Sequence, residues 1–277
     1  MTIHSKIPSI GLGTYMMSPE EAEEMTYEAI KIGYRHIDTA EVYRNEQGVA
    51  KGIERSLSEG LVSRSELFIT TKVFPGNEIW GQSQKTFDDV TESLDNSLKR
   101  LKLEYVDLYL IHSAHANKTR IEQWKALLEL KSMGKITYAG VANWNIKHLQ
   151  EINDADLPLP DTNQIELHPW AQQPELVEYL QNNNVHIIAY SSLVPLSTWR
   201  KKDGENSLKT KDMENEGSSV ESLFKILANK YNVKESQILL QWALQLKYAI
   251  LPKTIKIARL QENFQFSFVI EEEDMLL

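Results

Sequence analysis

The sequence predicts an α/β fold of one domain, a (β/α)8 or TIM barrel. Apolar, strand-like runs alternate with longer amphipathic stretches along the chain, which is the pattern of a parallel sheet with crossover helices. Eight strand-like runs within 277 residues match the strand number and usual size of this barrel, and no linker rich in Pro, Gly or Ser divides the chain. A doubly wound open sheet is the structural alternative, since hydrophobic periodicity does not distinguish the two.

Local signals place the individual elements. Short apolar runs bounded by polar or turn residues predict strands at 10–12, 35–37, 67–71, 106–111, 136–141, 162–167, 185–189 and 248–251. The first helix begins at Ser18-Pro19-Glu20-Glu21, where Ser caps the helix, Pro takes the first helical position and Glu21 completes a capping box. Gly33 ends it. Periodicity predicts later helices at 46–57, 87–101, 121–133, 146–153, 175–182 and 220–231.

The stretch 195–219 differs from the rest of the chain. It is polar, rich in Lys and Glu, and lacks helical periodicity, so we expect a long loop within the barrel. Loops of this length often serve as lids or binding segments, and a mobile insertion is the alternative.

The composition limits the classes of partner. A net charge of -9 argues against general affinity for nucleic acid or an anionic membrane. The chain has no cysteine, which excludes disulfides, thiolate metal sites and Cys nucleophiles, and we expect no bound metal. Residues 1–6 lack the apolar core of a signal peptide, and no apolar run approaches the ~20 residues that span a bilayer. We therefore expect a cytoplasmic monomer or weak dimer that binds a small molecule.

Four polar residues follow strand-like runs and predict a catalytic pocket. Asp38 follows the second strand, Tyr43 lies five residues later, Lys72 follows the third strand and His112 follows the fourth. Because the carboxyl ends of parallel strands share one rim, these side chains are expected to converge there. Each alone has an ordinary structural explanation, such as a loop cap or a core histidine. Their joint position favours a functional role.

This set of side chains suits proton transfer to a carbonyl. A free tyrosine titrates near 10, so we expect Lys72 to stabilise the phenolate of Tyr43 and make it a better acid. Asp38 would keep Lys72 protonated and oriented. His112 would hydrogen-bond the carbonyl oxygen and set where it rests.

No standard dinucleotide motif is present. Gly11-Leu12-Gly13 follows a short strand, but the third Gly of a Rossmann fingerprint is replaced by Met16, and the chain has no Walker sequence. A dinucleotide would have to bind in another way.

Over nearly its whole length the chain resembles the aldo-keto reductases. Three ordered signatures carry the likeness: Gly33-Tyr34-Arg35-His36-Ile37-Asp38-Thr39-Ala40 with Tyr43, Asn45 and Glu46; Leu108-Tyr109-Leu110-Ile111-His112; and Leu251-Pro252-Lys253-Thr254 with Arg259, Glu262 and Asn263. The resemblance implies a (β/α)8 barrel, NADPH or NADP+ bound without a Rossmann domain, and reversible reduction of aldehydes or ketones. It also implies a catalytic tetrad of Asp38, Tyr43, Lys72 and His112.

The resemblance further implies the cofactor contacts. Asn143 and Gln164 would hold the nicotinamide carboxamide, and the ring of Tyr190 would stack on the nicotinamide. Ser191 and Leu193 would follow the pyrophosphate. The remaining positions would surround the adenosine: Lys253, Thr254 and Arg259 at its 2′-phosphate, with Glu262 and Asn263 near the adenine. Lys and Arg beside a doubly charged phosphate favour NADPH over NADH.

Several positions depart from the family pattern. Ala142 stands where the family usually has Ser, Trp144 replaces a common Phe, and 257–258 reads Ile-Ala where Pro and Glu are frequent. The chain ends soon after 271–274, so the long C-terminal loop of many relatives is expected to be mostly absent. The substrate pocket is then expected to be open and partly aromatic, with a wall from Tyr15, Phe74, Trp80 and His112. Packing within an irregular loop is the alternative for Trp80.

Two other functions stay open. The first is a non-enzymatic barrel, a sensor or structural subunit, that binds NADPH without turnover; the intact tetrad argues against it. The second is an unrelated barrel hydrolase using a carboxylate pair drawn from Asp38, Glu41 and Glu166.

Overall fold

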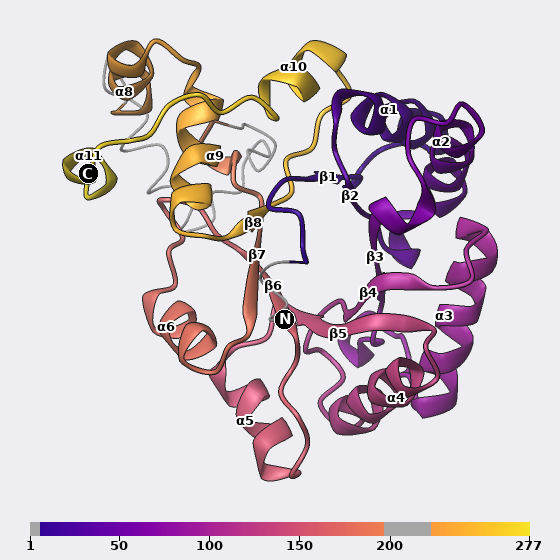
Figure 1. Cartoon of the computed structure of the whole chain (residues 1–277). Coiled ribbons are helices and arrows are strands. Elements are labelled where there is room, and N and C mark those ends of the chain that lie inside the picture. The colour runs from indigo at the N-terminus through magenta and orange to yellow at the C-terminus, as the bar shows by residue number, and fades with distance from the viewer. Residues whose placement is uncertain (1–5, 197–222) are drawn as a thin grey trace.

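Eight parallel strands form a barrel with helices around it (Figure 1). The computed structural model describes residues 6–196 and 223–277. The strands neighbour one another in chain order: β1 Gly11–Gly13, β2 His36–Asp38, β3 Phe68–Val73, β4 Val106–Ile111, β5 Ile136–Ala142, β6 Thr162–Glu166, β7 His186–Tyr190 and β8 Ala249–Ile250. A parallel bridge between Ile10 and Ile250 joins the two ends of the sheet. The predicted barrel is confirmed, and the open-sheet alternative is wrong.

The helices follow the predicted order closely. They are α1 Pro19–Ile32, α2 Glu46–Ser58, α3 Phe87–Leu101, α4 Arg120–Ser132, α5 Ile146–Asp154, α6 Pro174–Asn182, α8 Leu223–Tyr231, α9 Glu235–Gln245, α10 Ile257–Glu262 and α11 Glu272–Met275. The sequence prediction missed α9, α10 and α11. Residues 238–243 of α9 are all buried, so this helix shows no clear polar face from which its periodicity could be read. The two other missed helices have six and four residues, too few for a periodic signal.

The caps of α1 confirm the predicted boundary. The Ser18 hydroxyl accepts the Glu21 amide at 3.1 Å, and the Glu21 carboxylate accepts the Ser18 amide at 2.9 Å. At the other end Gly33 has φ 126°, a conformation that side chains disfavour, and its amide donates to Ala29.

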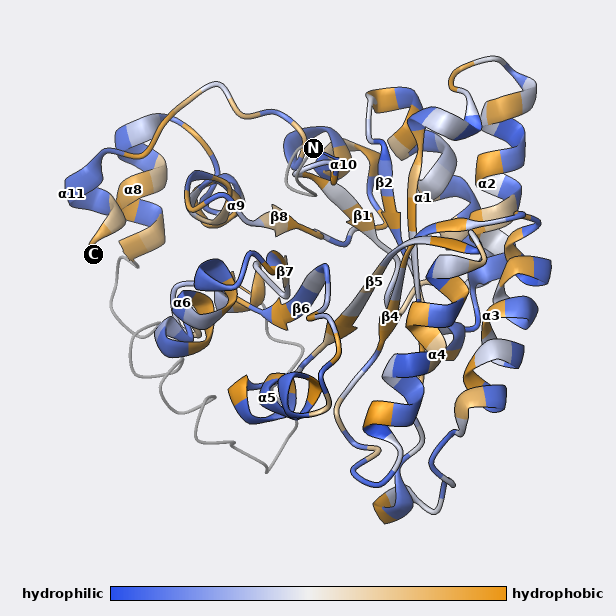
Figure 2. Cartoon of the chain, turned by 60° about the horizontal axis from the view of Figure 1, so that its bottom comes forward, coloured by the Kyte–Doolittle hydropathy of each residue, from blue (hydrophilic) through white to orange (hydrophobic). Residues whose placement is uncertain are grey.

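Two apolar layers hold the barrel together. Side chains along each strand alternate between the barrel interior and the surrounding helices. On β4, for example, Leu108 and Leu110 belong to the interior cluster, whereas Tyr109 and Ile111 pack with the helices. Figure 2 shows apolar and polar residues alternating along the outer helices, as amphipathic helices over a sheet require. The same alternation on β3 turns Thr71 toward α2, where it bonds Glu46, and leaves Lys72 for the interior.

Two expectations, a long loop at 195–219 and no membrane-spanning segment, can be compared only with the described residues. Of the predicted loop at 195–219, residues 195 and 196 belong to a 3-10 turn at Val194–Leu196, and 197–219 lie outside the described residues. Within 6–196 and 223–277, no helix combines the length and apolarity that a membrane crossing would need.

His36 is buried in the barrel beside β3. Its Nε2 lies 2.9 Å from the hydroxyl of Thr70, and its ring meets Phe68 edge-on. Burial lowers the pKa of His36 to about 4, with a smaller opposing effect of Asp38. The ring is therefore neutral at physiological pH.

Replacing Gly48 should destabilise the contact between α1 and α2. A Cβ at this position would lie 1.9 Å from the backbone oxygen of Pro19. Gly48→Ala gains helix propensity but forces the two helices apart, so we expect a net loss of about 1–3 kcal/mol in the free energy of unfolding. Urea unfolding measures this loss of unfolding free energy. Lys51→Ala, an exposed site on the same helix, serves as control, and equal stability of the two variants would contradict the close contact.

His36 should make stability depend on pH. Because its pKa is lowered in the folded state, the unfolded chain takes up a proton first, and stability falls as the pH drops from about 6.5 toward about 4. Between pH 7 and pH 5, the unfolding free energy of the wild-type protein should therefore fall by about 2 kcal/mol more than that of His36→Gln, which lacks the titrating ring. Urea titrations at both pH values test this, and an unchanged loss would contradict it.

Candidate active site

The four predicted catalytic residues lie on three adjacent strands and the turn that follows β2. Asp38 is the last residue of β2, and Lys72 lies near the end of β3. His112 follows β4, where its amide bonds the Val73 carbonyl at 2.9 Å. Tyr43 ends a 3-10 turn, Glu41–Tyr43. The parallel register places all four at the carboxyl-terminal rim, as the sequence predicted.

Lys72 and Asp38 form a buried ion pair. The Lys72 ammonium donates to Asp38 Oδ1 at 2.5 Å and to the Thr39 carbonyl at 2.8 Å, and its side chain has no exposed surface. The second carboxylate oxygen, Oδ2, accepts the Gln164 amide at 2.8 Å. Burial lowers the pKa of Lys72, and the charge and hydrogen bond of Asp38 oppose that shift.

Tyr43 lies between this ion pair and His112. The Lys72 ammonium is 5.1 Å from the centroid of the Tyr43 ring, and the Tyr43 hydroxyl is 3.5 Å from His112 Nε2. Burial raises the pKa of Tyr43 well above its ordinary value, and Asp38 adds to the rise. The expected neighbour is present, but the expected lowering of this pKa is not found. Desolvation is the largest cause of the rise, and the nearby charge of Asp38 disfavours a phenolate further.

His112 is a neutral imidazole. Burial lowers the pKa of His112 to about 3, and the charge of Lys72 adds to the shift. Its backbone carbonyl accepts the side-chain amide of Asn143 at 3.0 Å. A neutral ring with Nε2 toward Tyr43 can donate one hydrogen bond at the rim without bringing in a second positive charge.

The residues expected to hold the nicotinamide lie next to this group. Asn143 follows β5 in a left-handed conformation, φ 63°, and its Oδ1 accepts the Tyr190 hydroxyl at 2.7 Å. Ser191 also has a left-handed backbone, and Leu193 packs half-buried against the core. Gln164 is buried and turns its amide to Asp38. This last contact connects the expected carboxamide site directly to the ion pair.

The residues expected around the adenosine lie after β8. Lys253 and Arg259 are exposed, and neither forms an ion pair with another residue in the described part of the chain. Thr254 is buried, and its hydroxyl accepts the Lys256 amide at 3.1 Å. These two unpaired cations fit a phosphate group.

The last two expected adenosine residues lie at the end of α10. Glu262 forms an ion pair with Lys234 across the gap between α10 and the start of α9, and Asn263 is buried.

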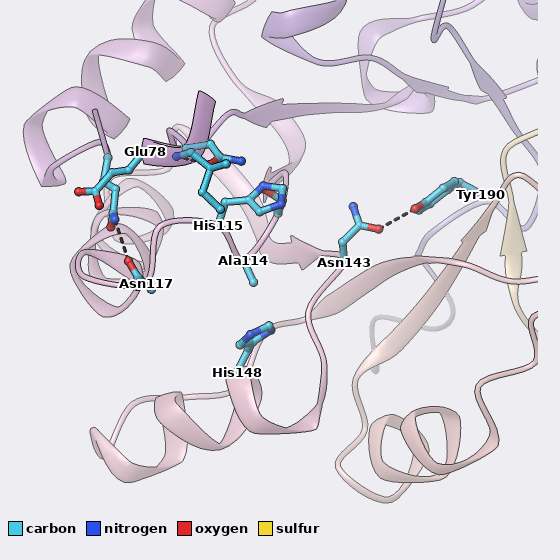
Figure 3. Close-up of a pocket in the computed structure, with 11 residues that line it drawn as sticks. Glu78, Ala114, His115, Asn117, Asn143, His148 and Tyr190 are labelled. Carbon is cyan, nitrogen blue, oxygen red and sulfur yellow. Dashed lines mark hydrogen bonds between the residues drawn. The ribbon is translucent and has the colours of Figure 1, made fainter. Parts of the chain in front are cut away.

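A pocket of about 630 Å³ opens beside Asn143 and Tyr190 (Figure 3). Its remaining walls come from the loops after β3 and β4 and from the first turn of α5, and most of the side chains are uncharged and polar: Asn77, Glu78, Ile79, Gln84, Ser113, Ala114, His115, Asn117 and His148. Gln84 donates to Asn117 at 2.8 Å and ties the first two loops together. Within the described residues, no cluster of His, Asp and Glu is arranged to hold a metal ion.

Aromatic side chains line the approach to Tyr43. Tyr15 is half exposed, with its ring 5.1 Å from that of Tyr43. The rings of Phe74 and Trp80 are nearly parallel, with centroids 6.1 Å apart. The centroids of the Trp80 and His115 rings are 5.3 Å apart. Trp80 is 64% exposed, and its ring also packs on Phe74 and His115, so the substrate wall and loop packing both stay open as its role.

Sequence reasoning missed most of the polar pocket wall. Asn77, Gln84 and Asn117 in loops and His148 in the first turn of α5 carry no motif, because isolated amides and histidines give no sequence signal of a site. Their one available signal was position, since loops after barrel strands form the rim where ligands bind. The contact of Gln164 with Asp38 also had no signal, because 126 positions separate the two in the chain.

Known proteins resemble this chain throughout. A sequence model of the aldo/keto reductase family matches residues 9–276. The methylglyoxal reductase DkgA of Yersinia pestis is 36% identical, over 98% of this chain and 87% of its own. The glyoxal reductase of Bacillus subtilis is 37% identical over the same shares. The crystal structure of a Bombyx mori aldo-keto reductase in complex with NADP superposes with a TM-score of 0.82 at 31% identity, covering 98% of this chain and 87% of that one. The chain therefore belongs to the aldo/keto reductase family.

Proposed function

We propose that this protein reduces aldehydes or ketones to alcohols by hydride transfer from NADPH, with Tyr43 as the general acid. One observation carries the proposal: Tyr43 lies between a fully buried Lys72–Asp38 pair and a neutral His112 at the barrel rim. The reductase names of the relatives from Yersinia pestis and Bacillus subtilis support carbonyl compounds as substrates. The NADP complex of the Bombyx mori relative supports the cofactor.

Tyr43 and His112 together define where a carbonyl oxygen would rest. The tyrosine hydroxyl and the imidazole Nε2 lie 3.5 Å apart, so one oxygen atom can accept a hydrogen bond from each. Because His112 is neutral, it polarises the carbonyl as a donor and leaves the proton to Tyr43.

The raised pKa of Tyr43 is compatible with proton donation. A neutral phenol keeps its proton until hydride arrival turns the carbonyl oxygen into an alkoxide, which is a stronger base than a phenolate. After the proton has left, the ring centroid of the phenolate lies 5.1 Å from the ammonium of Lys72. Asp38 and Thr39 hold that ammonium in place.

NADPH, when bound, supplies the hydride. Asn143 and Gln164 would hold its carboxamide, Tyr190 would stack on the nicotinamide, and Ser191 with Leu193 would follow the pyrophosphate. Around the adenosine stand the other proposed contacts, Lys253, Thr254, Arg259, Glu262 and Asn263. A small carbonyl substrate would enter past the aromatic residues Tyr15, Phe74 and Trp80.

The alternatives have less support. A non-enzymatic barrel would keep the NADPH site but would not need a buried ammonium beside a tyrosine at the rim. A hydrolase would need two cooperating carboxylates. Asp38, Glu41 and Glu166 are instead engaged separately, with Lys72, Lys85 and His168.

Tyr43→Phe tests the proton donor. Loss of a general acid is expected to lower kcat by roughly 10²–10⁴-fold, whereas NADPH affinity should stay nearly unchanged because the ring is kept. NADPH oxidation against a graded panel of sugar, aromatic and keto substrates measures turnover, and NADPH fluorescence measures binding. Tyr27→Phe, which removes a hydroxyl bonded to Glu59 on the outer side of α1, is the control. A wild-type protein that binds NADPH but reduces nothing in the panel would favour the non-enzymatic alternative.

Lys253→Ala tests the reading of the 2′-phosphate. An exposed lysine that binds this group should raise the Kd for NADPH by roughly tenfold to a hundredfold and leave the Kd for NADH nearly unchanged. Fluorescence titration with both nucleotides measures the difference, and Lys256→Ala, a neighbouring exposed lysine, is the control. Equal weakening for both nucleotides would show that Lys253 does not contact the phosphate.

A further inference from the structure

Glu41 connects the turn that carries Tyr43 to the end of the strand that carries Lys72. It is the first residue of the 3-10 turn Glu41–Tyr43, and its side chain is 15% exposed. Its Oε1 accepts the backbone amide of Phe74, the residue directly after β3, at 2.7 Å. The same oxygen accepts the ammonium of Lys85, also at 2.7 Å. One carboxylate oxygen therefore joins the tyrosine turn, the end of β3 and a cation.

Lys85 is itself held in place from several sides. Its ammonium also donates to the Ser93 hydroxyl on α3 at 2.6 Å. Its backbone amide bonds the Pro75 carbonyl at 2.9 Å, which closes the base of the loop that carries Trp80. The buried side chain of Gln123 on α4 donates to the carbonyls of both Pro75 and Lys85. Lys85, the partner of Glu41, is therefore held in place by contacts with α3, α4 and Pro75.

We propose that Glu41 is a positioning residue for the proton donor, which together with Lys85 sets the distance of Tyr43 from Lys72 and His112. The proposal rests on the proposed carbonyl reduction and adds a residue that touches neither substrate nor cofactor. Only one residue separates Glu41 from Tyr43 within a single helical turn, so a shift of the Glu41 side chain displaces the tyrosine backbone.

The geometry of the site makes such a displacement costly. The Tyr43 hydroxyl and His112 Nε2 already lie at the outer limit of a hydrogen bond, 3.5 Å, before a substrate oxygen enters between them. A misplacement of about 1 Å can cost on the order of 10²-fold in rate. Without the ion pair, the short backbone turn, in which Tyr43 bonds to Ala40 and Arg44 to Glu41, would lose its link to a cation.

The opposite end of β3 provides a matched control. Asp107 accepts the backbone amide of Ile69 at 2.9 Å and the guanidinium of Arg64 at 2.8 Å, and its side chain is also 15% exposed. Asp107 therefore makes the same kind of contact to the same strand as Glu41, but at the end away from the rim. Its loss should cost similar stability without moving the tyrosine turn.

The test compares Glu41→Gln with Asp107→Asn. Each amide keeps an oxygen for the backbone donor and loses the ion pair. We expect similar decreases in Tm for the two variants. Only Glu41→Gln should lower kcat, by about tenfold or more, with the Kd for NADPH nearly unchanged and a smaller effect on the KM for the carbonyl, because the hydrogen bond from Tyr43 strengthens as the oxygen becomes an alkoxide.

Two further variants test the route of the effect. Lys85→Met should lower kcat like Glu41→Gln, since it removes the other half of the ion pair. In a Tyr43→Phe background, Glu41→Gln should lower the residual kcat no further, because a residue that acts through the hydroxyl has nothing left to position.

The outcomes separate the two proposals. Wild-type protein that reduces no carbonyl would overturn the proposed function, and the role of Glu41 with it. Active wild-type protein in which Glu41→Gln and Asp107→Asn have equal kcat would overturn the positioning role alone. A further loss of kcat from Glu41→Gln in the Tyr43→Phe background would also overturn it.

Discussion

The buried ion pair between Lys72 and Asp38 is the constraint on which the site depends. An ammonium without exposed surface is costly in a barrel interior unless it is paired and fully hydrogen-bonded, and removal of one partner of such a pair typically costs about 3–5 kcal/mol. Here Asp38 and the Thr39 carbonyl satisfy Lys72, and Gln164 satisfies the other carboxylate oxygen. The pair thereby holds β2, β3 and β6 together at one point of the rim.

The electrostatics of the site follow from this arrangement. Burial is the largest cause at both neighbours, and each charge of the pair adds to it: Asp38 favours the neutral form of Tyr43, and Lys72 favours the neutral form of His112. A neutral acid beside a neutral donor suits the proposed reaction, in which Tyr43 would give up its proton only to an alkoxide. The charge of Lys72 is then held close to where negative charge would develop on the tyrosine.

Rigid and adaptable parts of the site have different origins. The four residues of the proposed tetrad lie at strand ends and on one short turn. Hydrogen bonds between the barrel strands fix the strand ends, and the contact of Glu41 with Phe74 fixes the turn. The polar pocket and the aromatic residues belong to loops tied to one another by side chains, such as Gln84 with Asn117. Such a division would keep the proposed proton donor, Tyr43, fixed while loop residues can differ with the substrate.

The sequence by itself determined the barrel, most of its elements and the place of four polar residues at one rim, because periodicity, helix caps and strand ends are local signals. It did not reveal α9, whose buried faces hide its period. Only the tertiary structure decided the direction of the Tyr43 pKa shift, the bond of Gln164 to Asp38 and the role of Lys85 beside Glu41. These depend on burial and on contacts between residues 44 to 126 positions apart, which no local pattern encodes.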